Sequence, residues 1–157
     1  MTIAESCVAE LSNVEQFFNR STEELSEDLS GFTPAEGMMT AAQQVAHAAK
    51  TIDWFVEGAF RPEGFDMNFE EHIQDVMKVT SLTAARAWFT KSIADAKAVI
   101  ATKGDAELMA PLPDGPVMGG APRIAIVSGI NDHTAHHRGA LTVYARLSGK
   151  VPPMPYM

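Results

Sequence analysis

Near its C-terminal end the chain reads Asn131-Asp132-His133-Thr134-Ala135-His136-His137-Arg138-Gly139. This run lies within a longer stretch, from Ile126 to Tyr144, in which apolar side chains recur every three to four residues, as on one face of an α-helix. A helix advances about 100° per residue, so His133 and His137 fall on that apolar face, whereas His136 points about 100° away from His137. The pattern predicts a helix from near Pro122 to about residue 149, with two inward-facing histidines.

The same period predicts three further helices, over residues 3–29, 40–60 and 81–104. In the second of these, Thr40 can cap the first turn while Gln43 reaches back to it, as in a capping box. Ser81 is the expected start of the third. Gly149 is the expected glycine just beyond the last helix.

Long connections over residues 61–80 and 104–121 are rich in Gly, Pro and Asp and show no alternation of the strand type. We therefore expect an all-α protein, a four-helix bundle that forms a single domain over residues 1–157. Connections of nearly 20 residues allow helices that are not consecutive in the sequence to become neighbours.

Composition excludes several classes of protein. The net charge of −8 argues against a nucleic-acid binder, because phosphate contacts need clustered Lys and Arg. A single cysteine, Cys7, excludes an internal disulfide framework, fits a reducing compartment and is expected in the core. No segment resembles a signal peptide or a membrane span, so a cytoplasmic protein without a membrane partner is expected.

The pair His133 and His137 indicates a metal site. Four residues apart on a helix, their Cβ atoms lie roughly 5–6 Å from each other. One metal ion would satisfy both buried rings, although hydrogen-bonded core histidines remain the alternative, because two ligands do not make a site. The third ligand has to come from His47, in the Ala-rich second helix, or from His72. The neighbouring acidic residues make His72 the expected surface residue, so His47 is the better candidate.

Three more residues are candidates for a binding pocket. Gln44 shares a helical stripe with His47, and Trp54 lies close to it in helical phase. Arg138, next to the histidine pair, can attract an anionic ligand or form an ion pair on the helix surface. No catalytic residue is identified by sequence.

These motifs resemble those of the DinB family of metal-dependent enzymes. The resemblance rests on Thr40-Ala-Ala-Gln-Gln-Val-Ala-His47, on Asp132-His-Thr-Ala-His-His-Arg-Gly139, and on the segment Tyr144-Ala-Arg-Leu-Ser-Gly-Lys-Val-Pro-Pro-Met-Pro-Tyr156. It implies an up-down-down-up bundle, a divalent metal ion held by His47, His133 and His137, and a homodimer. Relatives include thiol S-transferases and thiol-dependent isomerases. One departure is Ala140, where the family motif often has glutamine.

Three neutral imidazoles leave a divalent ion with an open coordination position, which is typical of catalytic rather than structural sites. Zinc or nickel is the expected metal, and iron also suits imidazole ligands. Such an ion stabilises the anionic form of a bound thiol or water and so supplies a nucleophile at neutral pH. A thiol would serve in a thiol S-transferase and water in a hydrolase. The expected function is therefore a metal-dependent transferase or hydrolase for a small molecule, with a low-molecular-weight thiol as a candidate co-substrate. The alternative is a non-catalytic bundle that binds a metal or a small molecule.

Overall fold

The structure, a computed structural model, describes all residues from 1 to 157 and contains six α-helices and no strand. The helices are α1 (Ile3–Thr22), α2 (Ala41–Phe60), α3 (Phe69–Met77), α4 (Leu82–Ala101), α5 (Asp105–Met109) and α6 (Ala125–Leu147), with one short 3-10 turn, η1 (Glu27–Leu29). The prediction of an all-α protein is confirmed. No helix is both long enough and apolar enough to cross a lipid bilayer.

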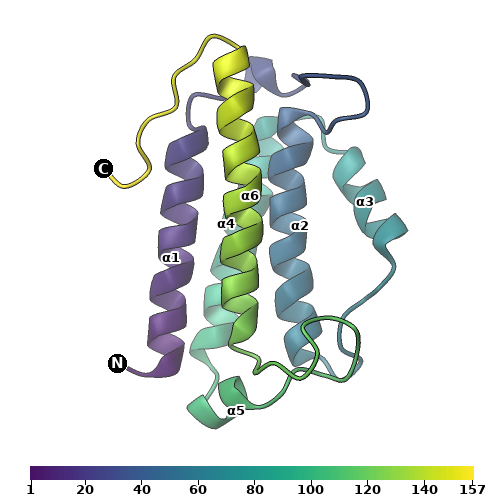
Figure 1. The fold of residues 1–157 in the computed structure, drawn as a ribbon, viewed down its shortest axis with the longest axis vertical. Coiled ribbons are helices and arrows are strands. Elements are labelled where there is room, and N and C mark those ends of the chain that lie inside the picture. Colours follow the sequence, from purple (N-terminus) through teal and green to yellow (C-terminus); the bar gives the residue numbers. More distant parts are fainter.

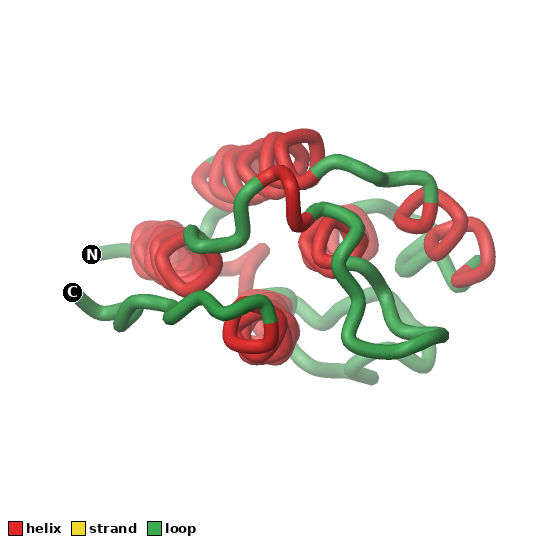
Figure 2. The backbone as a smooth tube through the Cα atoms, turned by 90° about the horizontal axis from the view of Figure 1, so that it is seen from above, coloured by secondary structure: helices red, strands yellow, loops and turns green.

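Four long helices, α1, α2, α4 and α6, form the bundle (Figure 1). Helices α1 and α6 run in one direction and α2 and α4 in the other, which is the expected up-down-down-up order. Both α1 and α2 pack against α4 and α6, so α1 and α2 lie diagonally across the core. Figure 2 looks along the bundle and shows the short helix α3 outside it, against α2, on the side away from the two chain ends.

The helix boundaries that depend on local signals are confirmed. Thr40 caps α2: its Oγ1 accepts the Gln43 N–H at 3.2 Å, and Gln43 Oε1 accepts the Thr40 N–H at 2.9 Å. Ser81 caps α4 by accepting the N–H of Ala84 at 3.1 Å. Gly149 follows α6 with a φ of +78°, a left-handed conformation that glycine adopts without strain.

The first helix ends at Thr22, seven residues before the predicted end at residue 29. Arg86 of α4 donates to the carbonyl oxygen of Thr22 at 2.6 Å and to that of Leu25 at 3.2 Å. These carbonyls therefore have a partner outside α1, and the chain leaves the helix without burying unsatisfied groups. Leu25 is still buried, as its place in the apolar period predicts, but beyond the helix end.

The two long connections contain short helices that the sequence analysis did not predict. Helix α3 lies within residues 61–80 and is capped by Asn68, whose side chain accepts the N–H of Glu71 at 3.3 Å. Helix α5 occupies part of residues 104–121, and α6 begins at Ala125, close to the predicted start near Pro122.

The core is built from the apolar faces of the four long helices, with Phe18 of α1 stacked on Phe89 of α4 at 4.2 Å between ring centroids. Cys7 lies in this core, as predicted. Helix α2 presents small buried residues to its neighbours, among them Ala41, Ala42, Ala46, Ala48 and Ala49. Small side chains let helices approach closely, so the imidazole of His47 can reach residues of α6.

Candidate metal centre

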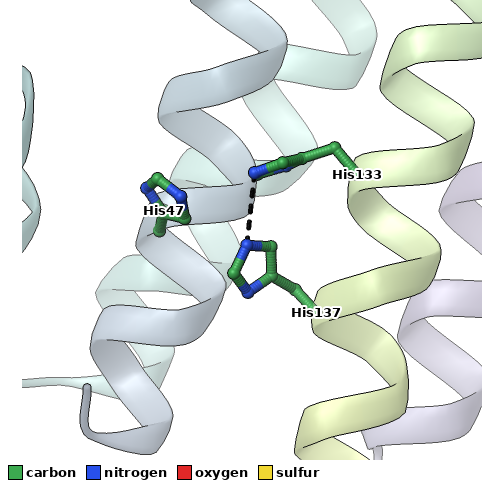
Figure 3. Close-up of side chains that lie close together, drawn as sticks. All are labelled: His47, His133 and His137. Carbon is green, nitrogen blue, oxygen red and sulfur yellow. Dashed lines mark hydrogen bonds between the residues drawn. The ribbon is translucent and has the colours of Figure 1, made fainter. Parts of the chain in front are cut away.

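The three histidines singled out by sequence meet between α2 and α6 (Figure 3). His47 extends from α2, and His133 and His137 extend toward it from successive turns of α6. The ring centroid of His47 lies 5.0 Å from that of His133 and 4.8 Å from that of His137. One ring nitrogen from each residue lies within 4.8 Å of the others, close enough for the three to hold one metal ion.

A chain of hydrogen bonds fixes the orientation of His137. The Tyr144 hydroxyl donates to the carbonyl of Met39 at 2.8 Å and accepts from the Gln44 amide nitrogen at 3.3 Å. The Gln44 amide oxygen therefore faces His137 and bonds its Nδ1. An amide oxygen only accepts, so the proton of His137 sits on Nδ1, and Nε2 directs its lone pair toward the cluster.

The cluster is uncharged at neutral pH. Burial, and then the neighbouring histidines, lower the pKa of His137 to about 3 and that of His133 to about 4. The pKa of His47 is also lowered, mainly by burial and then by His136. A buried imidazolium would be desolvated and repelled by its neighbours, so each ring stays neutral and keeps a lone pair for a cation.

The arrangement fits a divalent metal ion. His137 Nε2 lies 3.2 Å from His133 Nε2. Two lone pairs would repel each other at this distance, so the lone pair of His137 faces either a cation or a proton carried by His133 Nε2. The other ring nitrogen of His133, Nδ1, is buried without a hydrogen-bond partner. No carboxylate belongs to the cluster, and imidazole ligands of this kind suit zinc, nickel and iron.

A cavity of about 790 Å³ adjoins the cluster, between α2, α3, α6 and the connection before α6. His47 and His133 form part of its wall, whereas His137 lies outside the wall and is only 7% exposed. The cluster therefore opens onto the cavity through two of its three histidines. The apolar part of the wall consists of Trp54, Phe55, Phe69, Ile73 and Met118.

Of the three candidate pocket residues, only Trp54 lines this cavity. Gln44 lies behind the cluster and supports His137 instead. Arg138 faces α1, where its guanidinium lies 5.7 Å from the ring centroid of Phe17. Its position on α6 turns it away from the face that carries His133 and His137, so it brings no positive charge to the cavity.

The expectation that His72 is a solvated surface residue is wrong. It lies in the cavity wall with its side chain 18% exposed, and its Nε2 is 3.4 Å from a carboxylate oxygen of Asp66. The physical reason is that helix α3 carries it against α2, and the Trp54 indole donates to the Asp66 carbonyl at 2.6 Å nearby. The sequence did contain a signal, because Asn68 followed three residues later by Glu71 is a capping pattern for a helix over this segment.

Comparison with known proteins agrees with this architecture. A solved structure of a protein from Streptococcus pneumoniae, determined by a structural genomics consortium, is similar with a TM-score of 0.68. The similarity covers 96% of this chain and 92% of that chain at 15% sequence identity, so it concerns the fold alone. None of the curated proteins is detectably similar in sequence. The sequence profile of the DinB superfamily matches residues 10–141, which include the three clustered histidines; the chain belongs to the DinB superfamily.

Proposed function

We propose that this protein is a metal-dependent enzyme that acts on a small molecule bound in the cavity beside His47 and His133. The observation that carries the proposal is the juxtaposition of the three-histidine cluster with a cavity of about 790 Å³. A site with a purely structural metal would need no such cavity, whereas ligand sites are concave, mostly apolar and built around a few polar groups.

In this proposal His47, His133 and His137 hold the ion, and Gln44 keeps His137 in the tautomer that can bind it. A divalent ion held by neutral ligands supplies positive charge that favours the anionic form of a thiol or of water. The apolar wall around Trp54 and Phe55 excludes water from a bound substrate, which strengthens electrostatic interactions within the site.

The chain offers no thiol of its own for such a reaction. Cys7 is 4% exposed in the core, and burial raises the pKa of its thiol. A thiol nucleophile would therefore enter as a low-molecular-weight co-substrate, and water is the second candidate nucleophile. Zinc or nickel, with iron as a third option, is the proposed metal. A cytoplasmic location and a homodimer stay predictions.

The test is to assay transfer of glutathione, bacillithiol or mycothiol to an electrophilic acceptor, and hydrolysis of model esters and amides, with metal-loaded and chelated protein. We expect turnover that depends on the metal and is lost in His133→Ala. His136→Ala is the matched control, because it removes an exposed histidine of the same helix that is not part of the cluster. Turnover that survives chelation would contradict the proposal, and hydrolysis without thiol transfer would select water as the nucleophile. A protein that binds metal stoichiometrically but catalyses neither reaction would favour the non-catalytic alternative.

A further inference from the structure

The cavity beside the cluster has an aromatic wall. Trp54 and Phe55 come from α2 and Phe69 from the first turn of α3. The Trp54 ring centroid lies 5.1 Å from that of Phe55 and 5.9 Å from that of Phe69. The faces of aromatic rings carry negative potential, so a wall rich in aromatic side chains suits cations with an apolar body as well as neutral apolar groups.

The charged side chains of the wall point to the same kind of ligand. Besides the histidines they are Lys50, Glu70 and Asp132. Lys50 is already paired, since its ammonium lies 3.2 Å from a carboxylate oxygen of Asp75. Glu70 and Asp132 belong to none of the ion pairs in the molecule. The unneutralised charge that the side chains place on the cavity is therefore negative.

We propose that the organic substrate of this site is a cation with an apolar body, such as a quaternary ammonium compound or a protonated amine. This inference rests on the proposed function in that it takes the cavity as the substrate site. Glu70 directly follows Phe69 in α3, whereas the histidines lie between α2 and α6. The other unpaired carboxylate, Asp132, directly precedes His133 on α6, where a metal held by the histidines would repel a cation. The proposal therefore places the positive group of the ligand at Glu70, on the α3 side of the cavity.

The experiment is isothermal titration calorimetry of chelated, metal-free full-length protein with three probes of similar size. Benzyltrimethylammonium is the cation, benzyl alcohol the neutral compound and phenylacetate the anion. The quaternary cation cannot ligate a metal or donate a hydrogen bond, so its binding reports on charge and aromatic contact. We expect benzyltrimethylammonium to bind at least about fivefold more tightly than phenylacetate, and also more tightly than benzyl alcohol.

Three variants identify the groups responsible. Glu70→Gln removes one charge and should weaken binding of the cation about threefold, with little effect on benzyl alcohol. Phe69→Leu keeps an apolar wall but removes a ring face at a half-exposed position, and should cost about threefold for the cation. The double variant Glu70→Gln/Asp132→Asn should abolish the preference over phenylacetate. Glu57→Gln, which removes an exposed carboxylate of α2 outside the cavity, is the matched control and should bind like the unaltered protein.

Phenylacetate binding as tightly as the cation, no binding of any probe, or a double variant that behaves like Glu57→Gln would each overturn the inference. The proposed function is measured separately on the same samples, by metal content and metal-dependent turnover. A protein that binds metal and turns over a neutral or anionic acceptor would retain the proposed function and lose this inference. A protein that binds the cation but no metal would lose the proposed function and retain only a binding site for organic cations.

Discussion

Each clustered histidine is held in a different way. His137 is fixed through Gln44 and Tyr144 to the backbone of Met39, whereas the Nδ1 of His133 is buried without a partner. His47 packs edge-on against both rings. Of the three, His137 is therefore the side chain whose orientation is fixed by hydrogen bonds from outside the cluster, whereas His133 contacts polar groups only within it.

Removing any one clustered histidine should abolish tight metal binding. We expect one divalent ion per chain in the unaltered protein, and a loss of affinity of orders of magnitude in His47→Ala, His133→Ala and His137→Ala, because two imidazoles are too few to hold the ion. His136→Ala and His72→Ala should keep the metal, since neither belongs to the cluster. Elemental analysis of protein purified without chelator measures this, and full occupancy in His47→Ala would contradict the assignment.

Gln44 should influence metal affinity without touching the metal. Gln44→Leu keeps the side-chain volume but leaves His137 Nδ1 without its acceptor, and partners of this kind typically contribute about 10–100-fold to metal affinity. Gln44→Glu should retain the affinity, because a carboxylate also accepts from Nδ1. Competition with a chromogenic chelator gives the affinities, with Gln74→Leu on the exposed face of α3 as the control. Equal affinity in Gln44→Leu and Gln74→Leu would show that this hydrogen bond has no such role.

Among the secondary-structure elements, α2 contributes most to the site. It carries His47 and Gln44, and it supplies two of the five apolar residues of the cavity wall, Trp54 and Phe55. The capping box of Thr40 and Gln43 satisfies free backbone groups, and the Gln43 amide also donates to the Met77 carbonyl at the end of α3, at 3.2 Å. Gln43, which takes part in the cap of α2, therefore also contacts α3, the helix that forms one wall of the cavity.

Thr40→Ala should lower the free energy of unfolding by about 1 kcal/mol, because the Gln43 N–H loses the side-chain oxygen that accepts it. Urea denaturation followed by circular dichroism measures the change. Thr90→Ala makes the same substitution at an exposed position within α4 and should change stability by less than about 0.5 kcal/mol. If both variants lost equal stability, the cap would have no specific contribution.

For the whole molecule, the site borders the core and is joined to it through Tyr144. The apolar cluster of 30 buried residues draws on all four long helices, and none of the three clustered histidines belongs to it. A chain of this length can bury a sufficient core without a structural metal. We therefore expect the fold to persist without a metal ion.

In that metal-free state, stability should fall with acid because of the histidines. Their pKa values in the folded protein, about 3 for His137 and about 4 for His133, lie below the ordinary value of 6.5, so between these limits the unfolded chain binds more protons. The free energy of unfolding then rises with pH across this window, by up to about 1.4 kcal/mol per pH unit for each histidine, and levels off above 6.5. Urea midpoints from pH 4.5 to 7.5 give this slope. The slope should be smaller in the double variant His133→Ala/His137→Ala. An unchanged slope in that variant would contradict the attribution of this pH dependence to the two histidines.

The sequence by itself determined the features that arise from neighbours along the chain. The apolar period predicted all four long helices, and side chains within three residues of the helix starts predicted the caps at Thr40 and Ser81. The spacing of His133 and His137 likewise placed both rings on one face of α6. These features depend on contacts three or four residues apart, which are set by helix geometry.

Only the tertiary structure decided the features that join distant parts of the chain. Arg86 ends α1 from 64 residues away, and Gln44 orients His137 across 93 residues. The packing of α3 on α2 brings His72 and Phe69 into the cavity wall. The packing of α6 on α1 decides that Arg138, which points away from the histidines, meets Phe17. Helical phase gives the direction of a side chain on its own helix, but the group that it meets depends on which helices pack together and at what height.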